Sequence, residues 1–493
     1  MSKNQILEEI LKEVDKHPEI MSRREALKYL TLSPLAASVI AGTTIGTSEV
    51  SASSDVKGKI VIVGGGLGGM STAARLNNSI NNADITVIEP DPLSVSYQPG
   101  QTLVAGGIWK IDDIQYNRDE FVPKGVKLIK GSVTAFDPKN NKVTVDGTQV
   151  IVYDQLIIAT GVMLNYAAIK GLDGVITSNG KDNAATKNTI TKDGLHSIYF
   201  QDGAVATWAG IQELVAKAKA HKGPDKLQAL FTEPNTPIKC GGAPKKIMYL
   251  THARLVEAGV RDKVELTLYP DGGKMFGVPE YHDAIVKQFE ARGFKWNYKH
   301  NLVAVDTATK TATFDKWRME KTEVEDEMGD KIVKEVKVSE PVQVKYDFMH
   351  VSPPMKAPDV VGQSELGSQG PGFVTVDKET LKSSFFPNVW SLGDVVGVPM
   401  GKTGGSVRKQ YKVLVNNVIS AMGGKEPTSK YDGYTVCPLI TGIGTVMMAE
   451  FNWTKKPTPS FPLDPTKERW IMWLLKVYIL KPMTMYGMLS GRA

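Results

Sequence analysis

A series of three glycines between an apolar run and an alanine-rich stretch constrains this chain more than any other feature. The β-branched run from Ile60 to Val63 predicts a short strand, which leads into Gly64, Gly66 and Gly69. The stretch that begins at Met70 predicts an amphipathic helix. In such a unit the first glycine makes the tight turn, the second lets the backbone approach a diphosphate, and the third lets the helix pack against the strand. The diphosphate would lie at the N-terminus of the helix.

An acidic residue at the end of the next strand strengthens this interpretation. The run from Asp84 to Ile88 predicts a second strand, and Glu89 follows it, twenty positions after Gly69. A βαβ unit places there the carboxylate that accepts hydrogen bonds from a ribose. A glycine-rich turn without function is the alternative, because a lone GxGxxG pattern is common. Strand, spacing and acid together favour dinucleotide binding.

Composition and charge narrow the class of protein. The 493 residues are 42% hydrophobic and 23% charged, which is typical of a globular chain with two or three domains. The formal charge of +6 is spread along the sequence, so a nucleic-acid partner is not expected. Cys240 and Cys437 are the two cysteines, and neither has metal-ligand spacing to another cysteine or to a histidine. No metal site is therefore predicted.

Residues 1–53 predict a signal region. A short amphipathic helix comes first, then Arg23 and Arg24, then a weakly apolar stretch from Tyr29 to Ser48 and a small-residue cleavage site at Val50-Ser51-Ala52. Paired arginines before such a stretch resemble a twin-arginine signal. A membrane span is the alternative, but glycine, proline and few large aliphatic residues make the stretch poorly apolar. We therefore expect an exported protein on the periplasmic face of the cytoplasmic membrane.

A further buried strand is expected to complete the nucleotide site. Leu156 to Ile158 predicts this strand, and the small residues Ala159, Thr160 and Gly161 follow it. Their size would let the backbone approach the bound nucleotide, although an ordinary strand end has the same pattern.

A second α/β unit is predicted from Gly194 to Met355. The elements expected in it are a helix at 210–220 and strands at 226–231, 246–250 and 264–269. Where a nucleotide-binding domain has its glycine turn, this unit has no GxGxxG pattern and no acidic residue at the required distance. It therefore has no phosphate cradle for a nicotinamide nucleotide. The run from Pro237 to Pro244, with Cys240 in its middle, stands there instead. The charged stretch from Phe314 to Tyr346 predicts a solvated hairpin.

The C-terminal tail predicts a helix that lies on a membrane. Large apolar residues fall on one helical face at Trp470, Trp473, Leu474, Val477 and Tyr478. Lys476, Lys481 and Arg492 would contact anionic headgroups, as in an interfacial helix. The charges make the apolar run too short to cross a bilayer. The alternative is a helix docked on the core or on another subunit.

Several motifs together carry a resemblance to a known family. Besides the glycine series they are Tyr97-Gln98-Pro99, Pro237 to Pro244, His350 to Pro358, Gly393-Asp394 and Tyr431 to Gly442. From about residue 58 to the C-terminus, the chain resembles sulfide:quinone oxidoreductase, and it looks most like the branch that includes the mitochondrial enzymes. The surroundings of the two cysteines are the most specific part of the resemblance.

The resemblance implies a fold and a domain order. The fold class would be α/β, with two Rossmann-like, doubly wound domains of the disulfide-oxidoreductase flavoprotein type and a C-terminal membrane-interacting helical tail. The FAD-binding domain would comprise residues 54–193 and 356–424. The second Rossmann-like domain would comprise residues 194–355, and residues 425–493 would form a C-terminal region with one redox cysteine.

The resemblance also implies the residues of the cofactor site. FAD would be bound by Gly64, Gly66, Leu67, Gly68, Gly69, Glu89, Gln98, Val133, Ala159, Thr160, Gly161, Asp394 and Lys402. Asp394 would hold the ribityl chain, with a plain strand-to-turn aspartate as the alternative, and Lys402 would place a cation near the flavin. Some branches carry a further cysteine where this chain has Val162-Met163-Leu164, so FAD is expected to be non-covalent.

The two cysteines would form the redox pair. Sulfide would attack a disulfide between Cys240 and Cys437 and leave a persulfide on one residue and a thiolate on the other, with electrons passing to FAD and then to a quinone. Which cysteine carries the persulfide stays open. The implied partners are sulfide, a membrane quinone such as ubiquinone or menaquinone, a sulfur acceptor, the membrane surface and a second copy in a homo-oligomer. A disulfide that merely braces an exported protein is the structural alternative.

Three other functions remain as alternatives. A flavoprotein subunit of a flavocytochrome c-type sulfide dehydrogenase would pass electrons to a haem protein, which the apolar tail disfavours. A type II NADH:quinone oxidoreductase would need the second nucleotide fingerprint. A non-enzymatic flavin-binding protein would use the cysteines only as a brace.

Overall fold

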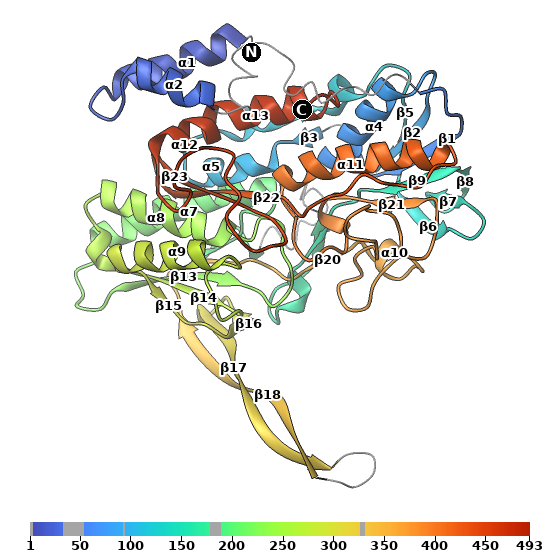
Figure 1. Ribbon diagram of the computed structural model, residues 1–493. Coiled ribbons are helices and arrows are strands. Elements are labelled where there is room, and N and C mark those ends of the chain that lie inside the picture. The colour runs from blue at the N-terminus through green and yellow to red at the C-terminus, as the bar shows by residue number, and fades with distance from the viewer. Residues whose placement is uncertain (1–2, 33–53, 92–93, 178–188, 326–330) are drawn as a thin grey trace.

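The computed structural model describes residues 3–32, 54–91, 94–177, 189–325 and 331–493. It contains two α/β domains, with a ribbon-like arm at one end and a layer of helices from both ends of the chain at the other (Figure 1). Most of the weakly apolar stretch that was predicted as part of a signal, residues 33–53, lies outside the described residues.

The first domain is built on a five-stranded parallel sheet. Its strands, in spatial order, are β21 (Val389–Ser391), β9 (Gln155–Ile158), β1 (Lys59–Val63), β2 (Asp84–Glu89) and β5 (Lys127–Lys130). The run from Ile60 to Val63 is continuously apolar because β1 lies between β2 and β9 and these four residues are buried. Two helices, α4 (Leu67–Ser79) and α11 (Gly404–Met422), pack together beside this sheet. The domain is thus closed by β21, which comes from late in the chain.

Smaller elements surround the first sheet. An antiparallel sheet contains β6 (Val133–Asp137), β7 (Lys142–Val145) and β8 (Gln149–Val152). A second contains β11 (Val175–Thr177), β10 (Met163–Asn165) and β20 (Met355–Lys356), and a third pairs β3 (Ser94–Ser96) with β4 (Gln115–Asn117). The short helices here are α5 (Gln101–Ala105) and α10 (Asp359–Gly362).

The second domain repeats the parallel arrangement. Its strands, in spatial order, are β12 (Leu195–His196), β19 (Phe348–His350), β13 (Leu227–Glu233), β14 (Val264–Pro270) and β15 (Lys295–Trp296). Its helices are α7 (Gln201–Ala220), α8 (Ala243–Glu257) and α9 (Pro279–Ala291). The strand predicted at 246–250 is wrong, because these residues lie in α8, which begins with a proline in its first turn. A fully buried apolar run has no periodicity that separates helix from strand.

The charged stretch forms an arm that projects from the second domain. It consists of β16 (His300–Asp306), β17 (Thr311–Glu325) and β18 (Lys331–Lys345), which pair in antiparallel order. Figure 1 shows the ends of β17 and β18 far from the rest of the molecule. The predicted solvated hairpin is therefore confirmed.

The C-terminal region adds a hairpin and a helical tail. The hairpin pairs β22 (Thr435–Gly442) with β23 (Thr445–Phe451). The tail runs through α12 (Trp470–Leu474), the π-helical turn η7 (Leu475–Ile479), α13 (Leu480–Pro482) and the π-helical turn η8 (Met483–Met488). Within the described ranges, no helix combines the length and apolarity needed to span a bilayer.

The tail packs on the protein with the face that was expected to lie on a membrane. Trp473, Leu474 and Val477 are less than a tenth exposed. Lys476 is buried and donates a hydrogen bond to the carbonyl oxygen of Pro99 at 2.9 Å, while Lys481 donates to that of Asp113 at 3.0 Å. The predicted headgroup contact of Lys476 is therefore wrong, whereas Lys481 is partly exposed. The contacts of both lysines with the protein agree with the alternative prediction, a helix docked on the core.

The N-terminal segment is a helical hairpin that packs against the tail. Its helices are α1 (Lys3–Lys16) and α2 (Arg23–Leu32), and the apolar residues Ile6, Ile10, Val14, Ala26 and Leu30 are buried. The ring of His17 meets the ring of Trp470 edge-on, with centroids 5.9 Å apart. Arg23 forms an ion pair with Asp15. Arg23 and Arg24, which were predicted to open a signal, thus belong to a folded helix. The sequence was misread because an amphipathic helix and a signal both contain basic residues followed by apolar ones.

Candidate functional site

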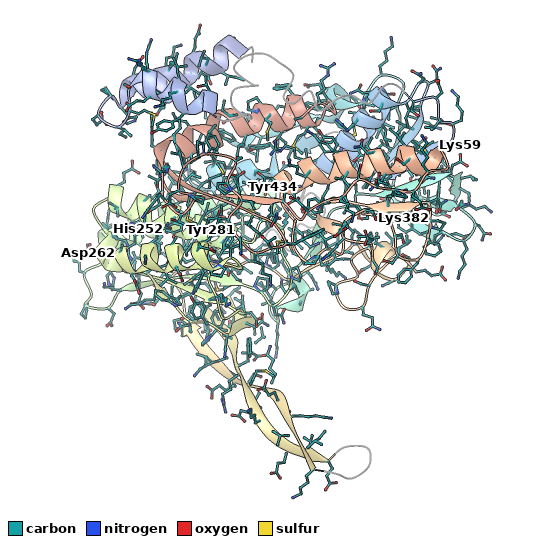
Figure 2. All side chains as sticks on the ribbon, viewed as in Figure 1. Lys59, His252, Asp262, Tyr281, Lys382 and Tyr434 are labelled. Carbon is teal, nitrogen blue, oxygen red and sulfur yellow. The ribbon has the colours of Figure 1, made fainter. Side chains whose placement is uncertain are left out.

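A cavity of about 1120 Å³ lies where the two domains, the β22–β23 hairpin and the tail meet. Single small-molecule sites measure roughly 300–1,000 Å³, so this cavity has room for a dinucleotide and for reactants. All sequence-predicted site residues except Gly69 line it. They are Gly64, Gly66, Leu67, Gly68, Glu89, Gln98, Val133, Ala159, Thr160, Gly161, Cys240, Asp394, Lys402 and Cys437. Figure 2 labels one further lining residue, Tyr434, near the middle of the molecule.

The turn between β1 and α4 forms one part of this cavity. Gly64 has a φ of +105°, and a Cβ there would lie 2.4 Å from the carbonyl oxygen of Ala159. A Cβ at Gly69 would lie 1.8 Å from the carbonyl oxygen of Gly64, so this glycine lets the helix pack against the strand. At Gly66 a Cβ would meet no atom within 4 Å. No side chain caps α4 at Gly66, which leaves the first amide groups of the helix for an anionic ligand.

Glu89 lies beside the same turn. Its carboxylate accepts hydrogen bonds from the backbone N–H of Gly65 at 2.6 Å and of Asp91 at 2.9 Å. The buried guanidinium of Arg118 lies 3.7 Å from this carboxylate and donates to the carbonyl oxygens of Gly65 and Asp91. Two accepted hydrogen bonds leave further lone pairs on Glu89 for a ligand. Sequence reasoning missed Arg118, because it lies outside any motif.

The opposite wall is built from the ends of β9 and β21. Gly161 has a φ of +71° with no atom near its missing Cβ, and the hydroxyl of Thr160 is buried without a hydrogen-bond partner among the described residues. The ammonium of Lys402 donates to the carbonyl oxygens of Asp394 and Val396. Burial lowers the pKa of Lys402 to about 8, and burial raises the pKa of the Asp394 carboxyl.

A turn at the start of α8 brings the two cysteines together. Cys240 has a φ of +53°, a left-handed conformation that costs a residue with a Cβ roughly 1–3 kcal/mol. Its N–H donates to the carbonyl oxygen of Lys402 at 3.0 Å, which ties the second domain to the first. A Cβ at Gly242 would lie 2.7 Å from the Sγ of Cys437, so β22 passes directly over this turn. Both cysteines are free thiols in this structure.

The environment of the cysteines favours a thiolate on Cys240. The pKa of Cys240 lies well below its usual range because the Cys437 thiol donates to it, and because the Lys246 ammonium lies 3.2 Å from its Sγ. The pKa of Cys437 is raised by that same hydrogen bond and by burial. The N-terminus of α8 adds a favourable partial positive charge. The pair therefore holds one proton, on Cys437.

Three buried lysines around the cysteines were not found from the sequence. Lys246 lies one turn into α8, in the segment wrongly predicted as a strand. Lys239 donates to the side-chain oxygen of Gln98 at 3.0 Å, and burial lowers its pKa to about 8. Burial, and then the charge of Lys246, lowers the pKa of Lys476 to about 7. Lys246 could have been found from the sequence as a basic residue six positions after Cys240. Lys476 could not, because only tertiary packing brings it near the cysteines.

The histidines that sequence reasoning left without a role belong to the cores of the domains. Burial lowers the pKa of both His196 and His252 to about 4. His196 stacks on Phe348 with centroids 5.1 Å apart, and His252 accepts a hydrogen bond from Arg261 at 2.9 Å. Neither is among the described residues that line the cavity. Their contacts are those of packed core residues.

Comparison with known proteins agrees with this geometry. The model of the family described as pyridine nucleotide-disulphide oxidoreductase matches residues 58–196. The mitochondrial sulfide:quinone oxidoreductase of Dictyostelium discoideum is 37% identical over 88% of this chain and 86% of its own length. The mitochondrial enzyme of Mus musculus is 35% identical over the same shares. That of Schizosaccharomyces pombe is 30% identical over 85% of this chain and 87% of its own.

Solved structures show the same fold. The sulfide:quinone oxidoreductase of Aquifex aeolicus superposes with a TM-score of 0.67 at 20% identity, over 88% of this chain and 92% of that one. NDH2 of Plasmodium falciparum in complex with NADH gives a TM-score of 0.54 at 11% identity, over 87% of this chain and 99% of that one. The predicted α/β fold with two doubly wound domains is confirmed.

These relatives overturn one prediction and identify the family. The three curated relatives above are named as mitochondrial proteins of eukaryotes, so the prediction of a periplasmic protein exported by a twin-arginine signal is wrong. The folded α1–α2 hairpin, which contains Arg23 and Arg24, agrees with this correction. Identity of 30–37% over more than four fifths of the chain, with two cysteines meeting beside a dinucleotide-type turn, places the chain in the sulfide:quinone oxidoreductase family.

Proposed function

We propose that this protein oxidises sulfide at Cys240 and Cys437 and passes the electrons through FAD to a membrane quinone. The observation that carries the proposal is the meeting of the two cysteines, from separate regions of the chain, in the cavity that also contains the glycine turn. Proteins of this family are FAD-dependent oxidoreductases. The missing second nucleotide fingerprint disfavours NADH as the electron donor.

The cavity fits FAD on structural grounds. The open positions at Gly66 and Gly161, the uncapped N-terminus of α4 and the unpartnered hydroxyl of Thr160 offer backbone approach and hydrogen-bond donors. We propose that FAD is held by Gly64, Gly66, Leu67, Gly68, Glu89, Gln98, Val133, Ala159, Thr160, Gly161, Asp394 and Lys402, with Gly69 shaping the turn. When bound, FAD supplies the acceptor for two electrons from the cysteines and their donor to quinone. Both cysteines are assigned to sulfur chemistry, so FAD is non-covalent, and acid precipitation should release it.

The environment of each cysteine assigns its part in the sulfide step. Hydrosulfide attacks the Sγ of Cys437 in the disulfide, the sulfur–sulfur bond breaks, and Cys240 leaves as a thiolate. A leaving thiol of low pKa leaves faster, and Lys246 lowers the pKa of Cys240. The outer sulfur of the Cys437 persulfide then passes to an acceptor nucleophile, which leaves a second thiolate. Loss of two electrons from the two thiolates restores the disulfide, so atoms and charge balance.

The buried lysines suit an anionic substrate. Lys246 and Lys476 are buried and place positive charge beside the cysteines in the protein interior, where a charge interaction is stronger than in solvent. Hydrosulfide is therefore attracted to the cavity and the Cys240 thiolate is stabilised.

We propose that the side of the molecule covered by the C-terminal tail faces the membrane. The tail covers the cavity, and Tyr486 and Arg492 at its end are exposed. An exposed aromatic and an exposed arginine suit the boundary between headgroups and acyl chains. Flotation with anionic liposomes should be weakened in the double variant Tyr486→Ser with Arg492→Glu. Val333→Ser on the arm, where Val333 is 65% exposed, is the matched control and should float normally.

We also propose self-association through the arm. Most of β18 and the outer half of β17 lack a further strand neighbour among the described residues, so each leaves backbone groups for a second copy. Light scattering of the holoenzyme tests this, and a monomer at all concentrations would contradict it.

The decisive test of the proposed function uses the purified holoenzyme without oxygen. Sulfide should bleach the flavin absorbance rapidly, and NADH should leave it unchanged. Decylubiquinone should then restore the absorbance, whereas cytochrome c should not. Bleaching by NADH would favour the NADH:quinone oxidoreductase, reoxidation by cytochrome c alone would favour the flavocytochrome subunit, and no bleaching by either donor would leave a flavin-binding protein.

A further inference from the structure

A buried carboxylate with no cationic partner faces the cavity from the β22–β23 hairpin. Glu450 on β23 is 3% exposed and lines the cavity together with Tyr434 and Ser460. Within the part of the chain that the structure describes, no lysine or arginine lies within ion-pair distance of its carboxylate. Burying a carboxylate without a countercharge is costly, so the position needs an explanation beyond packing.

Fixed hydrogen bonds hold this side chain. Tyr434 donates its O–H to one carboxylate oxygen at 2.5 Å. The N–H and the hydroxyl of Ser460 donate to the other oxygen at 2.8 and 3.0 Å. The hydroxyl of Tyr281 accepts from the N–H of Glu450 at 3.1 Å and donates to its carbonyl oxygen at 2.8 Å. Figure 2 labels Tyr281 and Tyr434, which belong to the second domain and the C-terminal region.

The hydrogen bonds of Glu450 connect solvent to the cavity. Ser460 is exposed, and Tyr434 is half-buried and lines the cavity. Three buried lysines that line the same cavity, Lys239, Lys402 and Lys476, differ in this respect. Their hydrogen bonds run to backbone carbonyls and to Gln98 in the interior. Of these four buried charged groups, Glu450 is the one bonded directly to an exposed residue.

We propose that Glu450 relays protons from solvent at Ser460, through Tyr434, to the quinone that is reduced in the cavity. This inference rests on the proposed function. Oxidation of hydrosulfide to sulfur at the level of a persulfide releases two electrons and one proton. Reduction of a quinone to a quinol takes up two electrons and two protons, so each turnover takes up one proton from solvent.

The relay conserves protons at each step. Tyr434 gives the proton of its O–H to the quinone oxygen, and the oxygen of Tyr434 takes up a proton delivered through Glu450. Glu450 receives that proton from water at Ser460, so one proton enters from solvent for each proton given to the quinone. Ser460 and Tyr434 keep the carboxyl group in one orientation, which is the requirement for proton transfer over hydrogen-bond distance.

Charged groups flank the residues of the relay. Arg408 and Lys409 of α11 lie 6.0 and 5.5 Å from the ring centroid of Tyr434. Glu280 and Asp464 lie near Tyr281, which holds the backbone of Glu450.

The test compares Glu450→Gln and Tyr434→Phe with the wild-type holoenzyme. In stopped flow, sulfide should bleach the flavin of both variants at the wild-type rate. Reoxidation of the sulfide-reduced protein by decylubiquinone should fall at least about tenfold in Glu450→Gln, in line with the loss of an acid–base group. Glu450→Asp should recover part of this rate, because it restores a carboxyl group. Glu468→Gln is the matched control, because Glu468 is paired with Arg292 at 2.5 Å outside the relay.

The outcomes separate the relay from the proposed function. Normal reoxidation of Glu450→Gln would overturn the relay alone, whereas failure of sulfide to bleach the wild type would overturn the proposed function. Loss of FAD in Glu450→Gln, with no recovery of the rate in Glu450→Asp, would assign Glu450 a structural role and also overturn the relay.

Discussion

The turns that follow the central strands of the two parallel sheets, β1 and β13, occupy the same place in the two domains and are built for opposite purposes. In the first domain, β1 leads through glycines into α4, and the space beyond Gly66 is open. In the second, β13 leads through a longer segment into α8, and Cys240 fills the turn with a thiolate. Both turns direct the N-terminus of a helix at a negative group. The first is shaped for the diphosphate of a ligand, and the second supplies the anion itself.

The difference lies in which part of the turn must be small. In the first turn, added carbon at Gly64 or Gly69 would collide with the backbone of the protein. In the second, the collision at Gly242 is with the Sγ of Cys437. One set of glycines makes room for a strand and a cofactor, and the other makes room for a reaction partner on another strand. A single parallel topology therefore provides two sites whose chemistry depends on side chains added at the turn.

The largest expected effect is the removal of either sulfur atom. Cys240→Ser and Cys437→Ser should each reduce sulfide-dependent flavin bleaching by at least about 10³-fold, because hydrosulfide then has no sulfur–sulfur bond to attack. The FAD content, measured after acid precipitation, should be unchanged, since the cofactor turn lies in the other domain. A variant that melts at a lower temperature but keeps its turnover would mean that the cysteines are only a brace.

The next effect should separate the two turns by their tolerance of a methyl group. Gly69→Ala puts a Cβ 1.8 Å from a backbone oxygen and should destabilise the first domain by roughly 1–3 kcal/mol, with loss of bound FAD. Gly241→Ala is the matched change in the second turn, where nothing lies within 4 Å of the new carbon. It should keep FAD and melt normally. Thermal unfolding and flavin absorbance measure both, and equal damage from the two changes would remove the contrast between the turns.

The first turn could be predicted from sequence because its requirements are local. Strand, glycines, helix and Glu89 lie within one βαβ unit, so spacing alone encodes their geometry. The surroundings of Cys240 are not local. Cys437 reaches it from β22 and Lys476 from the tail, which only the tertiary fold brings together. The cysteines were found through their resemblance to a family, and Lys476 was assigned to a membrane surface.

The errors at the two ends of the chain have a common physical cause. Amphipathic helices that pack on each other and helices that lie on a membrane share an apolar face and basic residues. The sequence of the tail and of α1–α2 shows the face but not what covers it. In the structure the two segments meet, with α1 packed on η7 and the ring of His17 against that of Trp470. The paired arginines were misinterpreted for the same reason.

A smaller effect should follow from removing the cation beside Cys240. Lys246→Met should raise the pKa of the Cys240 thiol, because the ammonium 3.2 Å from its Sγ favours the thiolate. Alkylation of Cys240 by iodoacetamide in the reduced protein, followed by mass spectrometry, should therefore slow about tenfold near neutral pH and recover as pH rises. Lys245→Met, which removes the ammonium paired with Glu233 one residue away, is the control. An unchanged pH profile in Lys246→Met would show that Cys437 and the helix alone stabilise the thiolate.

The smallest effect concerns Lys476, which the tail inserts above the second turn and not the first. Burial and the charge of Lys246 lower its pKa to about 7, so its ammonium is charged below that pH and is lost as pH rises through it. The charge attracts hydrosulfide, so wild type should have a higher kcat/KM for sulfide than Lys476→Met. The ratio of the two values should be about three- to tenfold at acidic pH and approach one above neutrality. Taking the ratio at each pH cancels the ionisation of sulfide itself. Lys481→Met, which removes a tail lysine that hydrogen-bonds to Asp113, should give a ratio near one throughout. A ratio that is flat or grows with pH would mean that Lys476 only fills space beneath the tail.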